Sequence, residues 1–217
     1  MTVLVYSHPY FTNSGNMMKY IEKLEVLLPV GYLYLIIVGI LKESVFFYQL
    51  DINILKYSSI MDVLLNPIAT LFSNPIVFFT IVSFFTFCFY LPSFLFKKGH
   101  IKWVQKVFEL KNNISDLPEN ELKNYYSFVS IKFLAIGLLS IYLGYGTAEG
   151  FLASKRIKEN RLHFDHKINY NTGESEDICL LETNSLYYFY VVKNEKIIKI
   201  APISAVKYTE INKNKKP

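Results

Sequence analysis

The side chains best suited to metal chemistry are His163, Asp165 and His166, which lie close together in the second half of the chain. His and Asp are common zinc ligands, and a catalytic zinc site uses three protein ligands. Apolar and polar residues alternate from Leu162 to Tyr170, which predicts a half-buried β-strand. Because successive side chains of a strand point to opposite faces, we expect His166 to point away from the other two. Two ligands are too few, so the sequence predicts no metal site.

The short motifs of common catalytic sites are missing from the sequence. It has no phosphate-binding G-x-x-x-x-G-K-[ST], no G-x-S-x-G, no H-E-x-x-H and no C-x-x-C. The two cysteines, Cys88 and Cys179, are far apart and have no Cys or His at the spacing of a metal site. We therefore expect a protein that is not an enzyme, has no disulfide framework and uses no cofactor.

Three charged residues beside long apolar segments are candidates for function: Lys42, Glu43 and Glu149. An ionisable group inside a membrane is costly and often functional. Lys42 and Glu43 are expected at a helix end, or with their charged groups at the membrane interface. For Glu149 we weigh an intramembrane functional carboxylate against an interfacial one that is either solvated or paired with Lys155.

The elements that position these residues are membrane spans. The run from Val63 to Phe96 has no charged side chain, and about 20 apolar helical residues cross the hydrocarbon core. We expect a helical membrane domain over 24–154. Its parts are spans at about 24–48, 75–96 and 125–154, with an interfacial or re-entrant segment at 51–73. In that segment Ser58 or Ser59 should cap a helix, and Asn66-Pro67 should break or kink it.

The composition also favours a membrane protein. Apolar residues make up 52% of the 217 residues and aromatic residues 17%, and the net charge is +5. Such a basic balance is typical of lysines near anionic lipid headgroups. Without an Arg-rich stripe we expect no nucleic-acid partner. Residues 1–23 read as an N-terminal tail without a cleavable signal, so the first span should anchor the chain.

Residues 99–114 predict an amphipathic helix, with Ile101, Val104 and Phe108 on one face and lysines between them. This helix can lie on a membrane surface, with its tryptophan at the level of the headgroups. Packing against the protein's own helices is an equally good interpretation. The residues expected at the membrane surface are Lys97, Lys98, Lys102, Trp103 and Lys106.

Small residues form a strip along the third span. Gly146 and Gly150 make a G-x-x-x-G pair, and Gly144 and Ala148 make a second small pair. Such spacing lets helix backbones approach closely in a membrane. The partner is either a second copy, giving a homo-oligomer, or the first span of the same chain through its glycines. The residues expected in helix packing are Gly137, Gly144, Gly146, Ala148 and Gly150.

The hydrophobic period changes from helical to two after the third span. Residues 155–211 predict five short strands, with a brief interruption at 202–204 before the last. The pattern suggests a small SH3- or Sm-type barrel, followed by a basic tail at 212–217. The predicted fold class is therefore an α-helical membrane protein with about three transmembrane helices plus a small C-terminal all-β, five-strand barrel-like domain.

The stretch LLETNSLYYFYVVKNEKIIKIAPISAVKYTEI, residues 180–211, resembles the C-terminal β modules of small bacterial integral membrane proteins. An aromatic strand, a charged turn and an I-x-P-x-S-x-V segment carry this resemblance, which brings no catalytic residue. The order of helices and then strands is also similar to that of membrane-anchored β-barrel effectors of bacterial anti-phage immunity. These resemblances imply a multi-pass protein of the cell membrane, in the bacterial inner membrane.

The topology follows from the number of spans and from the lysines. Three spans place the two ends of the chain on opposite sides. The lysines of loop 97–124 predict that this loop is cytoplasmic and the β module external. The cluster formed by Lys155, Arg156, Lys158 and Arg161 argues for the reverse, so the side of the module stays open.

The leading functional expectation is a non-catalytic membrane protein in contact with the lipid bilayer, whose β module binds a protein partner or senses a signal. A neighbouring gene whose product co-purifies would support it. One alternative is a membrane-disrupting or pore-forming effector, for example in anti-phage defence, which predicts toxicity on activation. A further alternative is a transporter or channel subunit, which would need oligomerisation to enclose a polar path.

Overall fold

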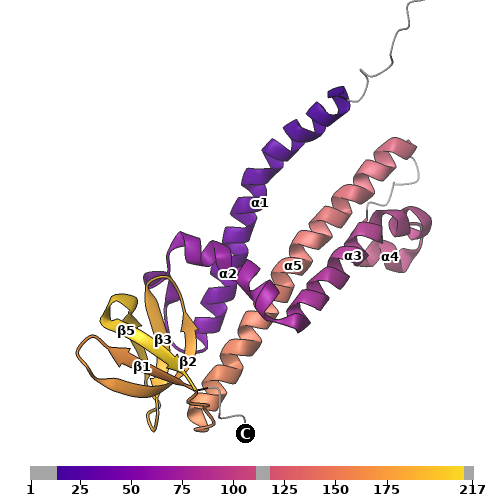
Figure 1. The fold of residues 1–217 in the computed structure, drawn as a ribbon. Helices are drawn as coiled ribbons and strands as arrows, with labels where there is room; N and C mark the ends of the chain where they lie inside the picture. The colour runs from indigo at the N-terminus through magenta and orange to yellow at the C-terminus, as the bar shows by residue number, and fades with distance from the viewer. Residues whose placement is uncertain (1–13, 111–117, 213–217) are drawn as a thin grey trace, which may run out of the picture.

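Three long helices run along the molecule, and a β-sheet lies at one end of them in the computed structural model (Figure 1). The structure describes residues 14–110 and 118–212. All three helices are long and apolar enough to cross a membrane by length and composition, which confirms that part of the predicted fold. The helices are α1 (Ser14–Tyr48), α3 (Pro75–Lys98) and α5 (Glu119–Lys158).

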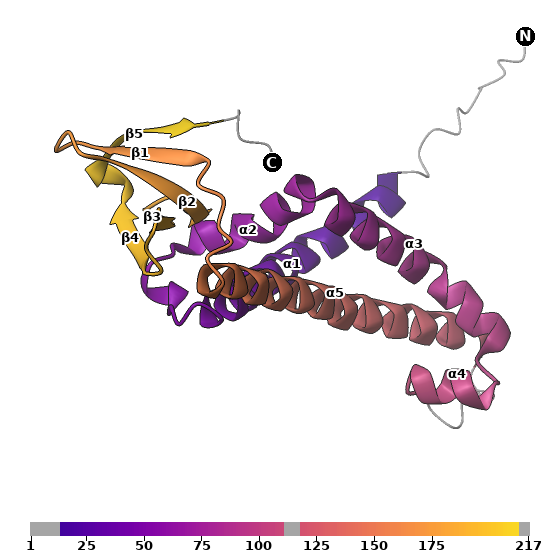
Figure 2. The ribbon, with the colours of Figure 1, turned by 90° about the horizontal axis from the view of Figure 1, so that it is seen from below.

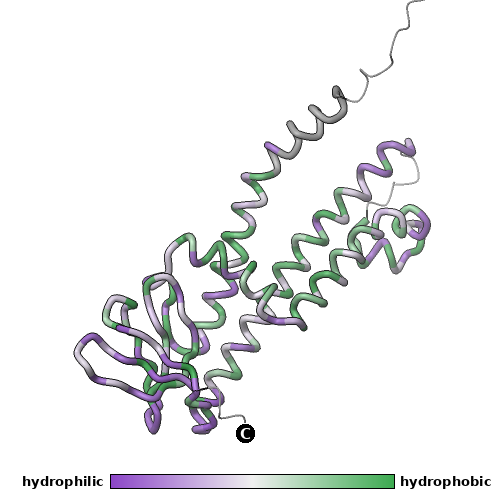
Figure 3. The backbone as a smooth tube through the Cα atoms, viewed as in Figure 1, coloured by the Kyte–Doolittle hydropathy of each residue, from purple (hydrophilic) through white to green (hydrophobic). Residues whose placement is uncertain are grey.

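The helices extend beyond the expected spans. α1 begins at Ser14, well before residue 24, and α5 runs from Glu119 to Lys158. At about 1.5 Å per residue, α5 exceeds the roughly 30 Å hydrocarbon core, so at least one of its ends must extend into the interface or water. α5 contacts both α1 and α3. Hydrophobic residues predominate along α3, the middle of α5 and the coloured part of α1, whereas hydrophilic residues are more frequent in the sheet and at the two ends of α5 (Figure 3).

The segment between the first two spans forms the 3₁₀ turn η1 (Ile54–Lys56) and the helix α2 (Ile60–Ser73). Ser59 caps α2 in a capping box with Asp62, as the sequence predicted. Of the expected break or kink at Asn66-Pro67, the break is wrong, because α2 continues through Pro67. It ends at Ser73, and the side chain of the next residue, Asn74, accepts hydrogen bonds from the first N–H groups of α3 while Pro75 occupies the first turn.

Helices α1 and α2 cross closely beside Pro67, through which α2 continues without a break. Pro67 has no N–H to donate to the carbonyl of Val63. Gly39 of α1 lies against that same carbonyl, where a Cβ would come within 1.9 Å of the oxygen. A glycine is therefore required at this crossing, and its Cα–H can contact the carbonyl oxygen that the proline leaves without a donor.

The helix after α3 is α4 (Lys102–Val107), which is shorter than the expected 99–114. Residues 111–114 lie outside the described residues. Val104 is buried against side chains of α3 and α5, so packing on the protein's own helices applies to this side of α4. Contact of the opposite side with a membrane surface stays a prediction. The residues that remain exposed for it are Lys97, Lys98, Lys102, Trp103 and Lys106.

The five predicted strands are present as one antiparallel sheet in the order β4-β3-β2-β1-β5. The 3₁₀ turn η3 (Ile203–Ala205) precedes the last strand. No pairing between β4 and β5 is found among the described residues, so closure into a barrel is not observed. The strands are β1 (His166–Tyr170), β2 (Ser175–Thr183), β3 (Tyr187–Val192), β4 (Ile198–Pro202) and β5 (Val206–Ile211).

Both faces of β3 are buried, and this joins the sheet to the helices. Tyr190 packs on one face in a cluster with residues of all five strands. Phe189 and Val191 point the other way and pack against the ends of α1 and α5. Figure 2 shows the sheet at the end where α1 and α5 finish, with α4 at the opposite end of α5. Residues that alternate along one strand therefore serve two separate cores.

We expect the protein to remain in the membrane pellet after an alkaline carbonate wash and to need detergent for release. Carbonate strips peripheral proteins, whereas helices that cross the hydrocarbon core are held by burial of their apolar surface. Immunoblots of pellet and supernatant, beside a peripheral marker protein, would measure this. Recovery of the chain with the marker in the supernatant would contradict the membrane assignment.

Candidate functional site

Lys42 and Glu43 do not lie at a helix end. They occupy the interior of α1 and are 4% and 6% exposed, so the expected helix end and the expected free charged groups are wrong, whereas their depth relative to a membrane interface stays a prediction. Burial of an unpaired charge costs several kcal/mol, so the surrounding residues must compensate. Their partners come from other helices and identify a polar cluster close to the sheet.

Lys42 makes three contacts inside the helical domain. Its Nζ donates a hydrogen bond to Asn66 Oδ1 at 2.8 Å and lies 3.5 Å from Glu43 Oε1. It also lies over the ring of Tyr145, 6.0 Å from the ring centroid. Asn66 accepts a second hydrogen bond from Thr70. Side chains of α1, α2 and α5 thus share one buried positive charge.

Glu149 continues the cluster on α5. Tyr145 Oη donates a hydrogen bond to Glu149 Oε1 at 2.5 Å, and Asn74 Nδ2 donates to Tyr145 Oη at 2.9 Å. The structure therefore pairs Glu149 with Tyr145 rather than with Lys155. Because Asn74 is also the cap of α3, the cluster connects all four helices of this region. We call the six residues Lys42, Glu43, Asn66, Asn74, Tyr145 and Glu149 the junction cluster.

Glycines of α5 bring the helices close enough for these contacts. A Cβ on Gly146 would lie 2.7 Å from the carbonyl oxygen of Lys42, and one on Gly150 would lie 2.5 Å from that of Phe46. The G-x-x-x-G pair thus packs against α1 of the same chain, one of the two partners that the sequence left open. Gly137 packs against Phe84 of α3, whereas Gly144 has no atom within 4 Å of its Cβ position and Ala148 is exposed.

An apolar core fastens the sheet to the helices next to the junction cluster. Phe47 of α1 and Phe189 of β3 are both fully buried, and their ring centroids are 4.8 Å apart. Ile54 and Ile157 belong to the same core. The sheet is therefore packed directly on the ends of α1 and α5, and movement of one part must disturb the other.

A hydrogen-bonded clamp adds to this contact at the start of α2. Asp62 accepts hydrogen bonds from the backbone N–H of Ser185 at 3.0 Å and from its hydroxyl at 2.9 Å. Ser59 donates to the same carboxylate from its own N–H and hydroxyl. Although burial alone would raise the pKa of Asp62, these hydrogen bonds outweigh it and hold that pKa below its usual value.

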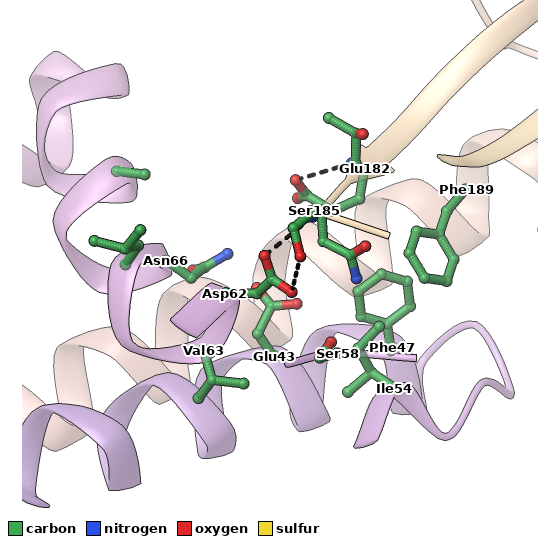
Figure 4. Close-up of a pocket in the computed structure, with 14 residues that line it drawn as sticks. Glu43, Phe47, Ile54, Ser58, Asp62, Val63, Asn66, Glu182, Ser185 and Phe189 are labelled. Carbon is green, nitrogen blue, oxygen red and sulfur yellow. Dashed lines mark hydrogen bonds between the residues drawn. The ribbon is translucent and has the colours of Figure 1, made fainter. Parts of the chain in front are cut away.

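A cavity of about 350 Å³ lies beside the clamp, between α1, α2 and the loop from β2 to β3 (Figure 4). Glu43, Asp62 and Glu182 line it together with Asn66 and apolar side chains. Burial raises the pKa of the Glu182 carboxyl, although the charge of Lys42 and the N–H of Thr183 oppose this shift. The arrangement can hold a positively charged group.

The residues first considered as metal ligands are arranged differently from the expectation. His166 does not point away from Asp165, since its Nδ1 lies 2.7 Å from Asp165 Oδ1. β1 begins only at His166, so strand alternation does not apply to the residues before it. No group of three His, Cys, Asp or Glu residues suited to a metal occurs in the part of the chain that the structure describes. Burial raises the pKa of the Cys179 thiol, which opposes a nucleophilic role.

Sequence reasoning missed Asp62 and Glu182 as members of a site. Asn66 was interpreted only as part of a break or kink in a helix, and Tyr145 only as part of an apolar span. The one local signal was Tyr145 four residues before Glu149, a spacing that places both side chains on one helix face. The other contacts join residues far apart in the chain.

Comparison of this chain with protein-family models, with curated proteins and with solved structures finds no match.

Proposed function

We propose that this chain is a non-catalytic, multi-pass protein of a cell membrane, specifically a bacterial inner membrane, whose β module binds a partner or senses a signal for the helices. The observation that carries this proposal is the contact between the module and the helices. Phe189 lies against Phe47, and Ser185 is clamped to Asp62. A module tethered only by a flexible linker would have no such contact with the helices.

We also propose that the module is of the SH3 or Sm type. The strand order β4-β3-β2-β1-β5 and the 3₁₀ turn before β5 support it. So does the single cluster in which Ile168, Ile178, Tyr190, Ala201 and Val206 meet, one from each strand. In this arrangement the outer strand β5 is the natural place for a partner. All its residues except the first are exposed, Tyr208 and Ile211 included.

The test is affinity capture of the full chain from detergent-solubilised native membranes. We expect one co-purifying protein with wild type and at least a tenfold loss with Tyr208→Asp, because exposed aromatic side chains often dominate binding. Ile197→Asp, a change at an exposed residue elsewhere on the module, is the matched control. Capture that is equal for wild type and Tyr208→Asp would contradict binding through β5.

A second candidate is a membrane-disrupting or pore-forming effector, which would act as a homo-oligomer. Gly144 and Ala148 favour it, because they form a small-residue pair that is exposed and is not packed against the described part of the chain. Small residues at such spacing let a second copy approach closely in lipid. In this reading the β module is the trigger, and expression with an activating signal is toxic to the cell.

A further inference from the structure

The cavity beside the clamp carries an unbalanced set of charges. Its lining includes the carboxyl groups of Glu43, Asp62 and Glu182, and it includes no Lys, Arg or His. Among the described residues Lys42 is the cation beside this wall, where it lies 3.5 Å from Glu43 Oε1 and donates to Asn66, so Asp62 and Glu182 are left without an ion-pair partner there. The walls therefore attract positive charge and repel anions.

Glu43 supplies an observation that is independent of this charge count. Its side chain is only 8% exposed, and its Oε1 accepts no hydrogen bond from the described residues. Lys42 Nζ is 3.5 Å from that oxygen. Figure 4 shows the carboxylate directed into the pocket toward Asp62. A buried carboxylate with incompletely used acceptors is costly, and a donor in the cavity that Glu43 lines would offset this cost at the same carboxyl group.

The three carboxylates differ in how many further hydrogen bonds they can accept. Both oxygens of Asp62 accept hydrogen bonds, from Ser59 and Ser185. Glu182 accepts one contact of 3.3 Å from the N–H of Thr183. Two carboxylates, Glu43 from α1 and Glu182 from β2, can therefore each accept hydrogen bonds from a ligand.

The apolar residues that line the cavity indicate the chemical character of the rest of the ligand. Phe47, Ile54, Val63 and Phe189 give the cavity an apolar side, which suits a hydrocarbon stem rather than a hydrated ion. No three acidic, His or Cys residues among the described ones are arranged to hold a metal. The occupant that fits is an organic cation with an ammonium group for each free carboxylate.

We propose that this cavity binds an aliphatic diamine, with one ammonium group on Glu43, the other on Glu182, and the methylene stem against the apolar wall. This ligand deepens the proposed function, on which it rests, because it names the class of signal. Bound there, it joins α1 to β2 alongside the Asp62–Ser185 clamp and strengthens the hold of the helices on the module.

The test is calorimetric titration of the full chain in detergent at constant ionic strength, with cadaverine as the diamine. Pentylamine, pentanol and magnesium chloride are the comparison ligands. We expect cadaverine to bind at least about tenfold more tightly than pentylamine, since it makes two charge-assisted contacts in place of one. Pentanol and magnesium should show no binding.

Glu43→Gln and Glu182→Gln should each weaken cadaverine binding by about tenfold or more. Glu174→Gln removes the same charge at an exposed position of the module and should leave it unchanged. If Glu43→Gln does not fold, Glu182→Gln carries the test, because it is not inside a helix. Equal affinity for pentylamine, or unchanged affinity in Glu182→Gln, overturns the proposal. Partner capture through Tyr208 is a separate readout, so failure there would count against the proposed function and not against the cavity.

Discussion

Replacement of both Gly146 and Gly150 by leucine is expected to destabilise the helical domain while the chain still inserts into the membrane. A Cβ at these positions would lie 2.7 Å and 2.5 Å from carbonyl oxygens of α1, well inside contact distance. Neither oxygen belongs to a flexible side chain, so the helices must separate. Overpacking costs about 1–3 kcal/mol per site, so we expect a loss of about 2–6 kcal/mol for the pair.

The separation of α1 from α5 would also draw Lys42 away from Tyr145, so the loss should exceed that of either single replacement. Thermal unfolding in detergent measures it, and carbonate extraction checks insertion. The matched control is Gly144→Leu with Ala148→Leu, which adds nearly the same bulk, one carbon less, to the exposed side of the same helix. If that control loses stability as much as Gly146→Leu with Gly150→Leu, the crossing of α1 and α5 is not the cause.

The double variant Gly144→Leu with Ala148→Leu also tests whether the protein self-associates. Cross-linking in membranes should detect an oligomer for wild type if the second candidate function applies, and Gly144→Leu with Ala148→Leu should abolish it without a change in stability. A chain that is monomeric in both forms would remove the pore-forming candidate in its oligomeric form. Comparison of the two double variants thus distinguishes helix packing within one chain from packing between two copies.

The sequence was sufficient where the structure depends on local patterns. The uncharged run to Phe96 predicted a span, and α3 ends two residues later, at Lys98. The alternation after Leu162 predicted strands, and the sheet is there. The cap at Ser59 needed only a serine three residues before an acidic side chain. Each of these features is decided by neighbours within a few residues.

The sequence was insufficient where partners lie far apart along the chain. Lys42 looked like the end of a span because a charged pair in apolar surroundings normally ends one. It is buried because Asn66 and Tyr145, which are distant in the sequence, are its partners. The helix through Pro67 likewise needs Gly39 of another helix. No local rule could connect these residues, since only the packing of the helices brings them together.

Lys42→Met is expected to be among the most destabilising single changes in this protein. The methionine nearly matches the volume of the lysine stem, so the main effect is loss of charge. Glu43 would then stay buried without its ion-pair partner, and Asn66 would lose a donor. Removal of one member of a buried pair costs about 3–5 kcal/mol, and thermal unfolding in detergent measures the change.

The double variant Lys42→Met with Glu43→Gln should recover much of that loss, because no uncompensated charge remains in the core. Recovery is the distinguishing result. A purely steric role of Lys42 predicts that the two changes add, whereas a buried ion pair predicts a coupling of about 0.5–3 kcal/mol. Lys155→Met, at an exposed position of α5, is the matched single control and should change stability little. Strict additivity of Lys42→Met and Glu43→Gln would show that the pair does not hold the junction cluster together.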